Sequence, residues 1–282
     1  MKKRKIFAFT ICAALLALSA AIAASAGAPL MRYYGVDVGQ GDCSLFILPG
    51  GETMVIDAGP EKNARRTARY LKSCGVRKID LLVATHPHED HIGGMRALLS
   101  AFPVGMIWDS GFSWGSHIQE KFYREIKKRN IPFKTVGRGY AAKLGGAELR
   151  VLAPARRLKN TRSDPNNNCV VMLVTYGKIS FLMTGDMERE EYASIRPLPR
   201  ATVLKAAHHG SSNGTSARLL REVSPEIIVI SYAKENDYGY PHRETVAAIR
   251  QAGVRRFDTA DGAVKLRTDG TSVIFDGKRE VK

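Results

Sequence analysis

The residues best suited to do chemistry lie in one short loop, His86–His91, whose sequence is HPHEDH. The pattern HxHxDH places four candidate ligands, His86, His88, Asp90 and His91, within these six residues, directly after an apolar segment. Neutral imidazole and carboxylate are ligands that zinc-like divalent cations prefer. The spacing allows His86 and His88 to bind one cation while Asp90 and His91 bind a second. A lone histidine is more often a packed or exposed residue, whereas this cluster predicts a metal site.

Two further polar clusters also follow apolar segments. Asp186 ends the sequence Thr184-Gly185-Asp186, and its carboxylate is able to bridge two cations. His208 and His209 begin a His-His-Gly-Ser turn after the apolar residues 202–207. Each feature is common in loops when taken by itself. Because all three clusters follow apolar strands, one edge of a sheet can bring them together.

The segments between these clusters alternate between strand and helix patterns. Alternating or continuous apolar runs predict strands at 31–38, 43–48, 52–56, 79–85, 105–108, 170–176, 178–183, 202–207 and 226–231, with two short strands closing the chain. Amphipathic patterns predict helices at 63–74, 95–102, 120–130 and 244–251. Residues 117–159 give the weakest pattern. Strands mixed with helices predict sheets with helices packed outside them, in one domain.

Several segments of the chain together resemble a known family. The loop His86–His91 resembles the signature of the metallo-β-lactamase superfamily, and other segments resemble the hydrolase-like domain of the competence DNA-channel protein ComEC. These segments are Val36–Asp42, Val55–Gly59, Asn166–Cys169, Leu182–Asp186, Leu204–Ser211 and Tyr238–His242. The resemblance runs from about Met31 to Gln251 in the family's order, without the membrane segments of the channel. We therefore expect a stand-alone, exported relative.

The resemblance implies an α/β (α+β) protein, a four-layer αββα sandwich with its site at one sheet edge. It assigns His86 and His88 to a first metal and Asp90 and His91 to a second, with Asp186 bridging the two.

The resemblance leaves one ligand of the second metal open between two neighbours. We favour His208 because it is nearer the strand end, and His209 then remains a metal or substrate contact. The resemblance also places Asp57 behind the ligand loop, where its carboxylate would accept a hydrogen bond from an imidazole and so fix the orientation of that ring.

One position departs from the wider superfamily. Asn168 stands where the first metal usually takes a third histidine, as it does in the ComEC-like branch. An amide oxygen is a harder and weaker ligand than imidazole, which shifts the preference towards Mn²⁺ or Mg²⁺. We expect two divalent metal ions, zinc or manganese, with magnesium as a further option.

Two such cations would act on water and on the attacked group. At a separation of about 3.5–4 Å they lower the pKa of a bridging water and yield a hydroxide near neutral pH. Asp90 would orient this nucleophile while binding the metal. His242, Ser211 and the second imidazole of the His208-His209 pair would donate hydrogen bonds to a phosphate or leaving group. The other interpretation of His242 is a loop residue without a special role.

The N-terminus has the organisation of a secretory signal peptide. Basic residues 1–5 precede the uncharged segment Ile6–Ala24 and the small residues Ala24-Ser25-Ala26. We expect a signal peptide over 1–26 and a hydrolase domain over 27–282, which makes the protein secreted or extracytoplasmic. An uncleaved membrane anchor is the alternative. Since the leader holds four of the 43 basic residues, its removal lowers the net charge from +16 to +12.

The strongly basic mature chain favours a polyanionic partner. The leading prediction is a dinuclear metallohydrolase of phosphodiester bonds, a nuclease that acts on extracytoplasmic DNA. One alternative keeps the chemistry but changes the substrate to teichoic acid, a choline ester or a phospholipid head group. Another is a DNA-binding module with little catalysis. The sequence gives no sign of a permanent protein partner, and the fold itself does not imply β-lactamase activity.

Overall fold

Two sheets form the centre of residues 29–277, the part of the chain that the computed structural model describes. The first sheet has the strand order β15-β14-β1-β2-β3-β4-β5-β6 and the second β13-β12-β11-β10-β9-β8-β7. The strands of the first sheet are β1 (Met31–Gly35), β2 (Ser44–Ile47), β3 (Thr53–Ile56), β4 (Ile79–Ala84), β5 (Val104–Asp109), β6 (Phe133–Thr135), β14 (Val264–Thr268) and β15 (Val273–Phe275). Those of the second are β7 (Ala141–Leu144), β8 (Ala147–Ala153), β9 (Val171–Tyr176), β10 (Ile179–Met183), β11 (Val203–Lys205), β12 (Ile227–Ile230) and β13 (Arg255–Asp258).

The main apolar core lies between the two sheets. Burial alternates along β1 and β8, so every second side chain of these strands points into the core. By contrast β12 is buried along its whole length, as expected for a strand covered on both faces. The rings of Tyr33, Phe46 and Phe181 meet in this core with centroids 5.0–5.4 Å apart. These contacts hold one sheet against the other.

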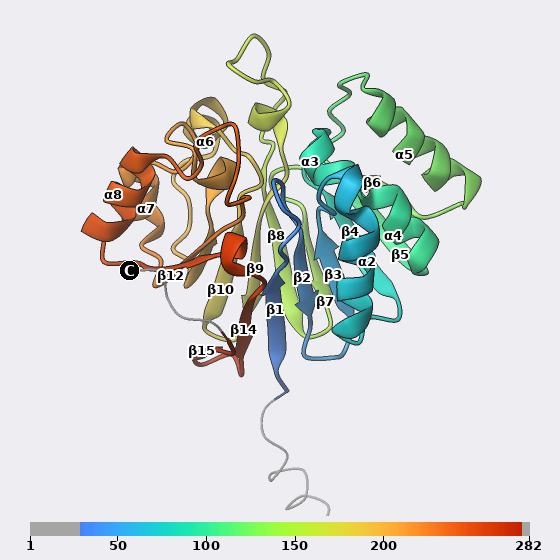
Figure 1. Ribbon diagram of the computed structural model, residues 1–282, viewed down its shortest axis with the longest axis horizontal. Helices are drawn as coiled ribbons and strands as arrows, with labels where there is room; N and C mark the ends of the chain where they lie inside the picture. The colour runs from blue at the N-terminus through green and yellow to red at the C-terminus, as the bar shows by residue number, and fades with distance from the viewer. Residues whose placement is uncertain (1–28, 278–282) are drawn as a thin grey trace, which may run out of the picture.

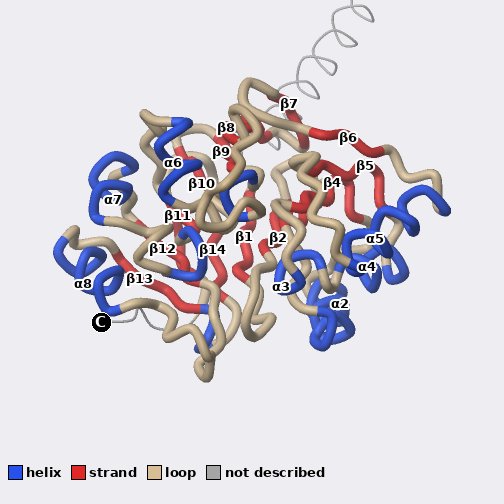
Figure 2. The backbone as a smooth tube through the Cα atoms, turned by 90° about the horizontal axis from the view of Figure 1, so that it is seen from above, coloured by secondary structure: helices blue, strands red, loops and turns tan. Residues whose placement is uncertain are grey.

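Helices cover the outer face of each sheet, as Figures 1 and 2 show. On the first sheet they are α2 (Ala64–Ser73), α4 (Met95–Ala101) and α5 (His117–Lys128), and their apolar side chains share a second core with it. On the other sheet they are α6 (Arg189–Ile195), α7 (Ala217–Val223) and α8 (Arg243–Gln251), which share a third. The four layers confirm the predicted αββα sandwich.

The sequence patterns missed several elements. The hairpin of β7 and β8 lies inside 117–159, and its turn is Gly145-Gly146 with φ of 52° and 85°. Such a Gly-Gly pair is a hairpin signal that sequence reasoning should have used. Helices α6 and α7 and strand β13 were also missed, and β1 ends at Gly35 rather than at residue 38.

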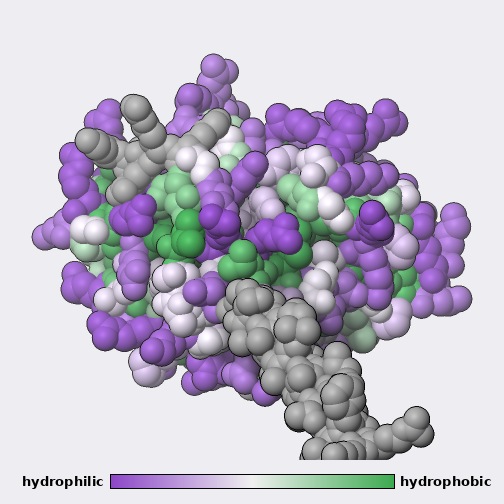
Figure 3. Space-filling model, turned by 90° about the horizontal axis from the view of Figure 1, so that it is seen from below, coloured by the Kyte–Doolittle hydropathy of each residue, from purple (hydrophilic) through white to green (hydrophobic). Residues whose placement is uncertain are grey.

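The predicted signal peptide at 1–26 lies outside the described residues. Within 29–277, none of the helices has the length and apolar character needed to cross a bilayer. Seen from below, the molecule has apolar side chains set among hydrophilic ones (Figure 3).

Loops that carry the polar clusters leave the sheets at one edge, the upper edge in Figure 1. They follow β3 and β4 in the first sheet and β10 and β11 in the second. Strand β3 runs parallel to β4, and β4 to β5; likewise β10 runs parallel to β11, and β11 to β12. Strands that run parallel end at the same edge, so side chains far apart in sequence meet there.

Candidate metal centre

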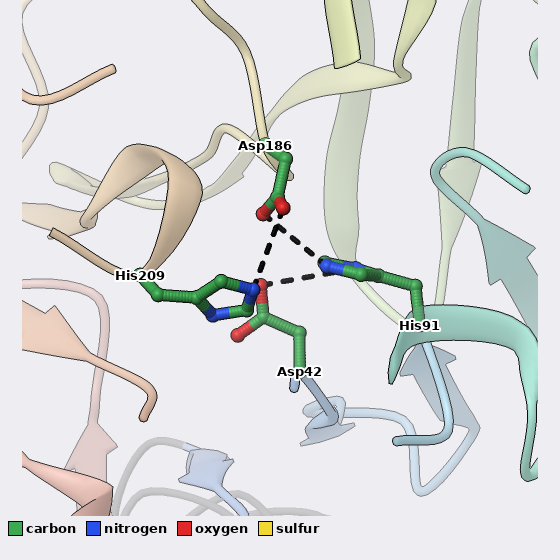
Figure 4. Close-up of side chains that lie close together, drawn as sticks. All are labelled: Asp42, His91, Asp186 and His209. Carbon is green, nitrogen blue, oxygen red and sulfur yellow. Dashed lines mark ion pairs between the residues drawn. The ribbon is translucent and has the colours of Figure 1, made fainter. Parts of the chain in front are cut away.

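Two groups of potential metal ligands meet at this edge and share Asp186. The first consists of Asp42, His91, Asp186 and His209, and one ligand atom of each lies within 4.8 Å of the others (Figure 4). The second consists of His86, His88 and Asp186 under the same limit. Asp42 comes from the loop after β1, and His91 lies in the short helix α3 (Glu89–Ile92). The arrangement offers places for two cations with one carboxylate between them.

The hydrogen bonds of His86 fix which of its nitrogens is free. Thr85 Oγ1 donates its only proton to Asp57 Oδ2 at 2.7 Å. The 3.0 Å contact between this oxygen and His86 Nδ1 therefore requires a proton on Nδ1. Nε2 then carries no proton, and it lies within hydrogen-bond distance of His88 Nδ1, at 3.0 Å, and 3.8 Å from Asp186 Oδ2. His86 thus directs a lone pair into the cluster.

His91 and His209 are oriented in the same way. His91 Nδ1 donates to Asp57 Oδ2 at 2.7 Å, and His209 Nδ1 donates to Ser231 O at 2.8 Å. Their Nε2 atoms face Asp186 at 3.2 and 3.4 Å, and neither has a well-aligned hydrogen bond within the described residues. Metal-binding histidines typically donate the other ring proton to an oxygen behind them. The pattern therefore fits a divalent cation.

The charges of the cluster support the same conclusion. Burial lowers the pKa of His209, but the Asp186 carboxylate outweighs it and raises the pKa to about 10. Burial also lowers the pKa of His91, and Asp186 and Asp57 again more than offset it. The buried carboxylates thus demand positive charge, which protons on the imidazoles supply. A divalent cation would bring that charge and displace the protons.

Backbone conformation holds the cluster together at two places. Asp57, His208 and His209 have φ of 59°, 49° and 52°, a region that residues other than glycine rarely adopt and that gathers at functional sites. A Cβ on Gly41 would stand 2.2 Å from Asp90 O. The glycine therefore lets Asp42 N donate to Asp90 O at 3.1 Å, which brings Asp42 against the histidine loop.

An open cavity of about 530 Å³ gives access to the cluster. Asp90 lines it, and its carboxylate lies 3.2 Å from His209 Nε2. His88, Asp186 and His209 line it as well, so the shared carboxylate and ligands of both groups face solvent-accessible space. The cavity therefore reaches residues of both donor groups.

The structure groups His209 with Asp42, His91 and Asp186 and leaves His208 outside both donor groups, which favours His209 over our predicted ligand His208. His208 Nε2 bonds to the Tyr240 hydroxyl at 2.9 Å, and Nδ1 pairs with Glu188 at 3.1 Å. Its closest approach to Asp186 is 3.8 Å. Left-handed backbone at both histidines turns the second side chain inwards, a conformation that nearness to the strand end does not reveal.

We expect His209→Ala to weaken metal binding far more than His208→Ala. Loss of a direct ligand should exceed the roughly 10–100-fold that is typical of an outer partner. Titration calorimetry with Mn²⁺ on each variant measures the difference. Equal loss in the two variants would contradict the assignment of His209.

Asn168, which we predicted as a metal ligand, makes its side-chain hydrogen bonds to the backbone of a neighbouring loop. Its Oδ1 accepts a hydrogen bond from Leu158 N at 2.9 Å, and its Nδ2 donates to Leu158 O and Asp164 O at 2.9 and 2.8 Å. The amide closes the base of the loop 158–164. The predicted role as a first-metal ligand finds no support in these bonds, because they direct the amide towards the loop backbone.

His242 and Ser211 also make contacts within the protein rather than with the cavity. His242 Nδ1 accepts from Ser212 N at 3.2 Å, and Nε2 lies 3.2 Å from Tyr238 O. Ser211 is buried, and its Oγ accepts from Asn213 N at 3.3 Å. Both ring nitrogens of His242 are therefore occupied in bracing the Tyr238–His242 segment.

Sequence reasoning missed two residues of the site, Asp42 and Lys205. Lys205 Nζ forms a very close ion pair with Asp42, donates to Gly185 O at 3.2 Å and lies 3.9 Å from Asp186. Both residues stand inside segments that carried the family resemblance, Val36–Asp42 and Leu204–Ser211. Their place in these motifs is the signal that would have found them.

The sandwich and its two-group donor cluster define the class of the protein. Residues 36–233 match the family described as the metallo-beta-lactamase superfamily, and the chain belongs to that superfamily. The chain is 26% identical over 258 residues to ComE operon protein 3 of Bacillus subtilis, covering 82% of this chain and 32% of the relative. It is 33% identical over 221 residues to Recombination protein 2 of Haemophilus influenzae, covering 76% and 26%. These matches confirm the predicted resemblance to the competence proteins.

The chain spans about a third of the first relative and a quarter of the second. Among solved structures, the metallo-beta-lactamase fold protein YhfI from Bacillus subtilis superposes with a TM-score of 0.57 at 16% identity. The match covers 82% of this chain and 96% of YhfI. It shows the same fold.

Proposed function

We propose that this protein is a metal-dependent phosphodiesterase that cleaves DNA outside the cytoplasmic membrane. The observation that carries the proposal is the pair of donor groups that share Asp186, at the base of an open cavity. Two divalent cations held there would activate water and neutralise the charge of a phosphodiester. The names of the relatives, a protein of the ComE operon and a recombination protein, favour DNA as the substrate.

The chain's own residues divide the work. His86, His88 and Asp186 would hold one cation, and His91, His209 and Asp186 the other, while Asp42 of that second group keeps its ion pair with Lys205. Asp57 accepts from His91 Nδ1 and so keeps its Nε2 aimed at the site. Asp90, at the wall of the cavity, would hold the attacking water by accepting its hydrogen bond and then receive its proton.

Charge gives a second argument for a polyanion. A net charge of +16, or +12 once the predicted leader is removed, attracts DNA from a distance and speeds its encounter with the site. Manganese or zinc would be the metal, since imidazole and carboxylate suit both. The predicted export would place the activity where DNA arrives from outside.

The purified protein with Mn²⁺ should degrade single- or double-stranded DNA, and the double variant His88→Ala with Asp186→Ala should not. A panel of DNA, bis(p-nitrophenyl) phosphate and teichoic acid, each with Mn²⁺ and with Zn²⁺, tests the substrate class. Cleavage of teichoic acid in preference to DNA would move the proposal to a cell-wall phosphodiester. Undiminished DNA cleavage by the double variant would sink it.

A further inference from the structure

Exposed aromatic rings stand close to the metal centre. Among the described residues, five large apolar side chains are exposed, and Tyr238 and Trp114 are the most exposed of them at 62% and 53%. Burial of a large aromatic ring stabilises the folded protein, and an exposed ring does not contribute this free energy. A ring that is exposed beside a site therefore points to a binding role.

The Tyr238 ring is presented at the cavity wall in a fixed position. It lies parallel to Tyr240, with centroids 5.3 Å apart and an interplanar angle of 13°. Asn236 Oδ1 accepts hydrogen bonds from the backbone N–H groups of both tyrosines, and the Tyr240 hydroxyl is hydrogen-bonded to His208 Nε2. His242 contacts Tyr238 O from behind. The Tyr240 ring is therefore anchored near the donor groups, while the Tyr238 ring faces solvent.

The Trp114 ring stands next to the other donor group. Its centroid is 6.4 Å from that of His88, a residue that lines the cavity, at an interplanar angle of 82°. Phe112 stacks beside it, and Gln119 accepts from the Trp114 backbone N–H at 2.8 Å. Trp114 comes from the loop between β5 and α5, whereas Tyr238 comes from the loop between β12 and α8. These elements lie on opposite sides of the molecule in Figure 2.

We propose that Tyr238 and Trp114 are stacking platforms for the nucleobases of a single strand whose phosphate lies at the metal centre. The inference rests on the proposed phosphodiesterase function and adds a specificity to it. Every base has a flat face that stacks on an aromatic ring, whatever its sequence.

The charges around Tyr238 fit a base better than a phosphate. Lys62 is the one lysine or arginine among the residues that line the cavity, against the carboxylates of Glu235, Asp237 and Glu89. These carboxylates repel a phosphate, whereas an uncharged base tolerates them and its amino groups can donate to them. The phosphate would then bind at the cations, and the bases would stack on the two rings at the edge of the cavity.

A preference for single strands follows. In a duplex the base faces are covered by their neighbours, and exposing one costs a few kcal/mol. The two rings therefore cannot stack on the bases of an intact duplex. Single-stranded DNA should be cleaved faster than the same sequence in a duplex.

The test compares a single-stranded oligonucleotide with one in which abasic sites surround the scissile phosphate. Tyr238→Ala and Trp114→Ala should each lower kcat/KM on the normal strand about tenfold, in keeping with stacking on one base. Neither should lower kcat/KM on the abasic strand. Tyr238→Phe keeps the ring and should retain the wild-type rate. Ile274→Ala removes an exposed apolar side chain from β15 and serves as the matched control.

Unchanged rates in both alanine variants, or equal losses on the normal and abasic strands, would overturn the stacking proposal while DNA cleavage itself stood. If the wild-type protein cleaves no DNA, binding measured by fluorescence anisotropy separates the two ideas. Binding that Tyr238→Ala weakens would then support the platforms without the phosphodiesterase. Binding that it leaves unchanged would reject the platforms.

Discussion

Asp186→Asn should remove both cations and slow DNA cleavage by about 10³-fold or more. The expected size follows from the several kcal/mol of transition-state stabilisation that bound metals supply, since about 4 kcal/mol corresponds to about 10³-fold in rate. No other single substitution of a donor should cost as much, because Asp186 is the only residue common to both donor groups of the described chain.

The geometry explains why an amide does not suffice. The two carboxylate oxygens of Asp186 face the Nε2 atoms of His91 and His209 at 3.2 and 3.4 Å, and that of His86 at 3.8 Å. Asparagine keeps the shape but loses the negative charge, and turns an NH₂ group towards one of the two cations. If Asp186 bridges two cations as proposed, each would need one of its oxygens, so in the variant one cation would lose a ligand and the other would lose charge compensation.

Elemental analysis together with initial rates checks this prediction. Asp186→Asn should bind close to no metal, whereas His88→Ala, which belongs to one group only, should keep one cation. Glu188→Gln is the matched control, since this neighbouring carboxylate pairs with His208 and lies outside both donor groups. Two cations and near wild-type rates in Asp186→Asn would show that the carboxylate does not bridge.

The placement of the site was predictable because it depends on strand order and spacing. Apolar runs ending in polar clusters identified the loops after β4, β10 and β11, and parallel strands bring such ends together. The four layers followed from the family resemblance and from the mixture of strands and helices. These features are written in short stretches of sequence, where each residue type carries a local meaning.

Other parts of the site depend on contacts that no local pattern contains. The choice between His208 and His209 is decided by left-handed backbone at two successive residues. The task of Asn168 depends on the loop that folds back over it, and the ion pair between Asp42 and Lys205 joins residues more than half the chain apart. Such contacts exist only once the sheets have assembled.

Lys205→Met should lower the free energy of unfolding of the metal-free protein by about 3–5 kcal/mol, the typical cost of breaking a buried ion pair. Lys205 is 3% exposed. Burial lowers the pKa of its ammonium, but Asp42 and Asp186 outweigh that effect and leave the pKa above its usual value. The lysine is therefore charged at neutral pH and serves as a permanent cation among carboxylates. Methionine fills similar space and leaves Asp42 buried without its partner.

Urea unfolding in the presence of a chelator measures this effect without interference from bound metal. Lys78→Met breaks an ion pair with Asp80 at 2.8 Å whose lysine is 56% exposed, and should cost far less stability because solvent screens the pair. The double variant Asp42→Asn with Lys205→Met removes both charges and should recover much of the lost stability, because the penalty comes from the unpaired carboxylate. If the single and double variants unfold at the same urea concentration, the loss comes from packing. Lys205 would then not be the cation that allows Asp42 to lie buried beside the metal ligands.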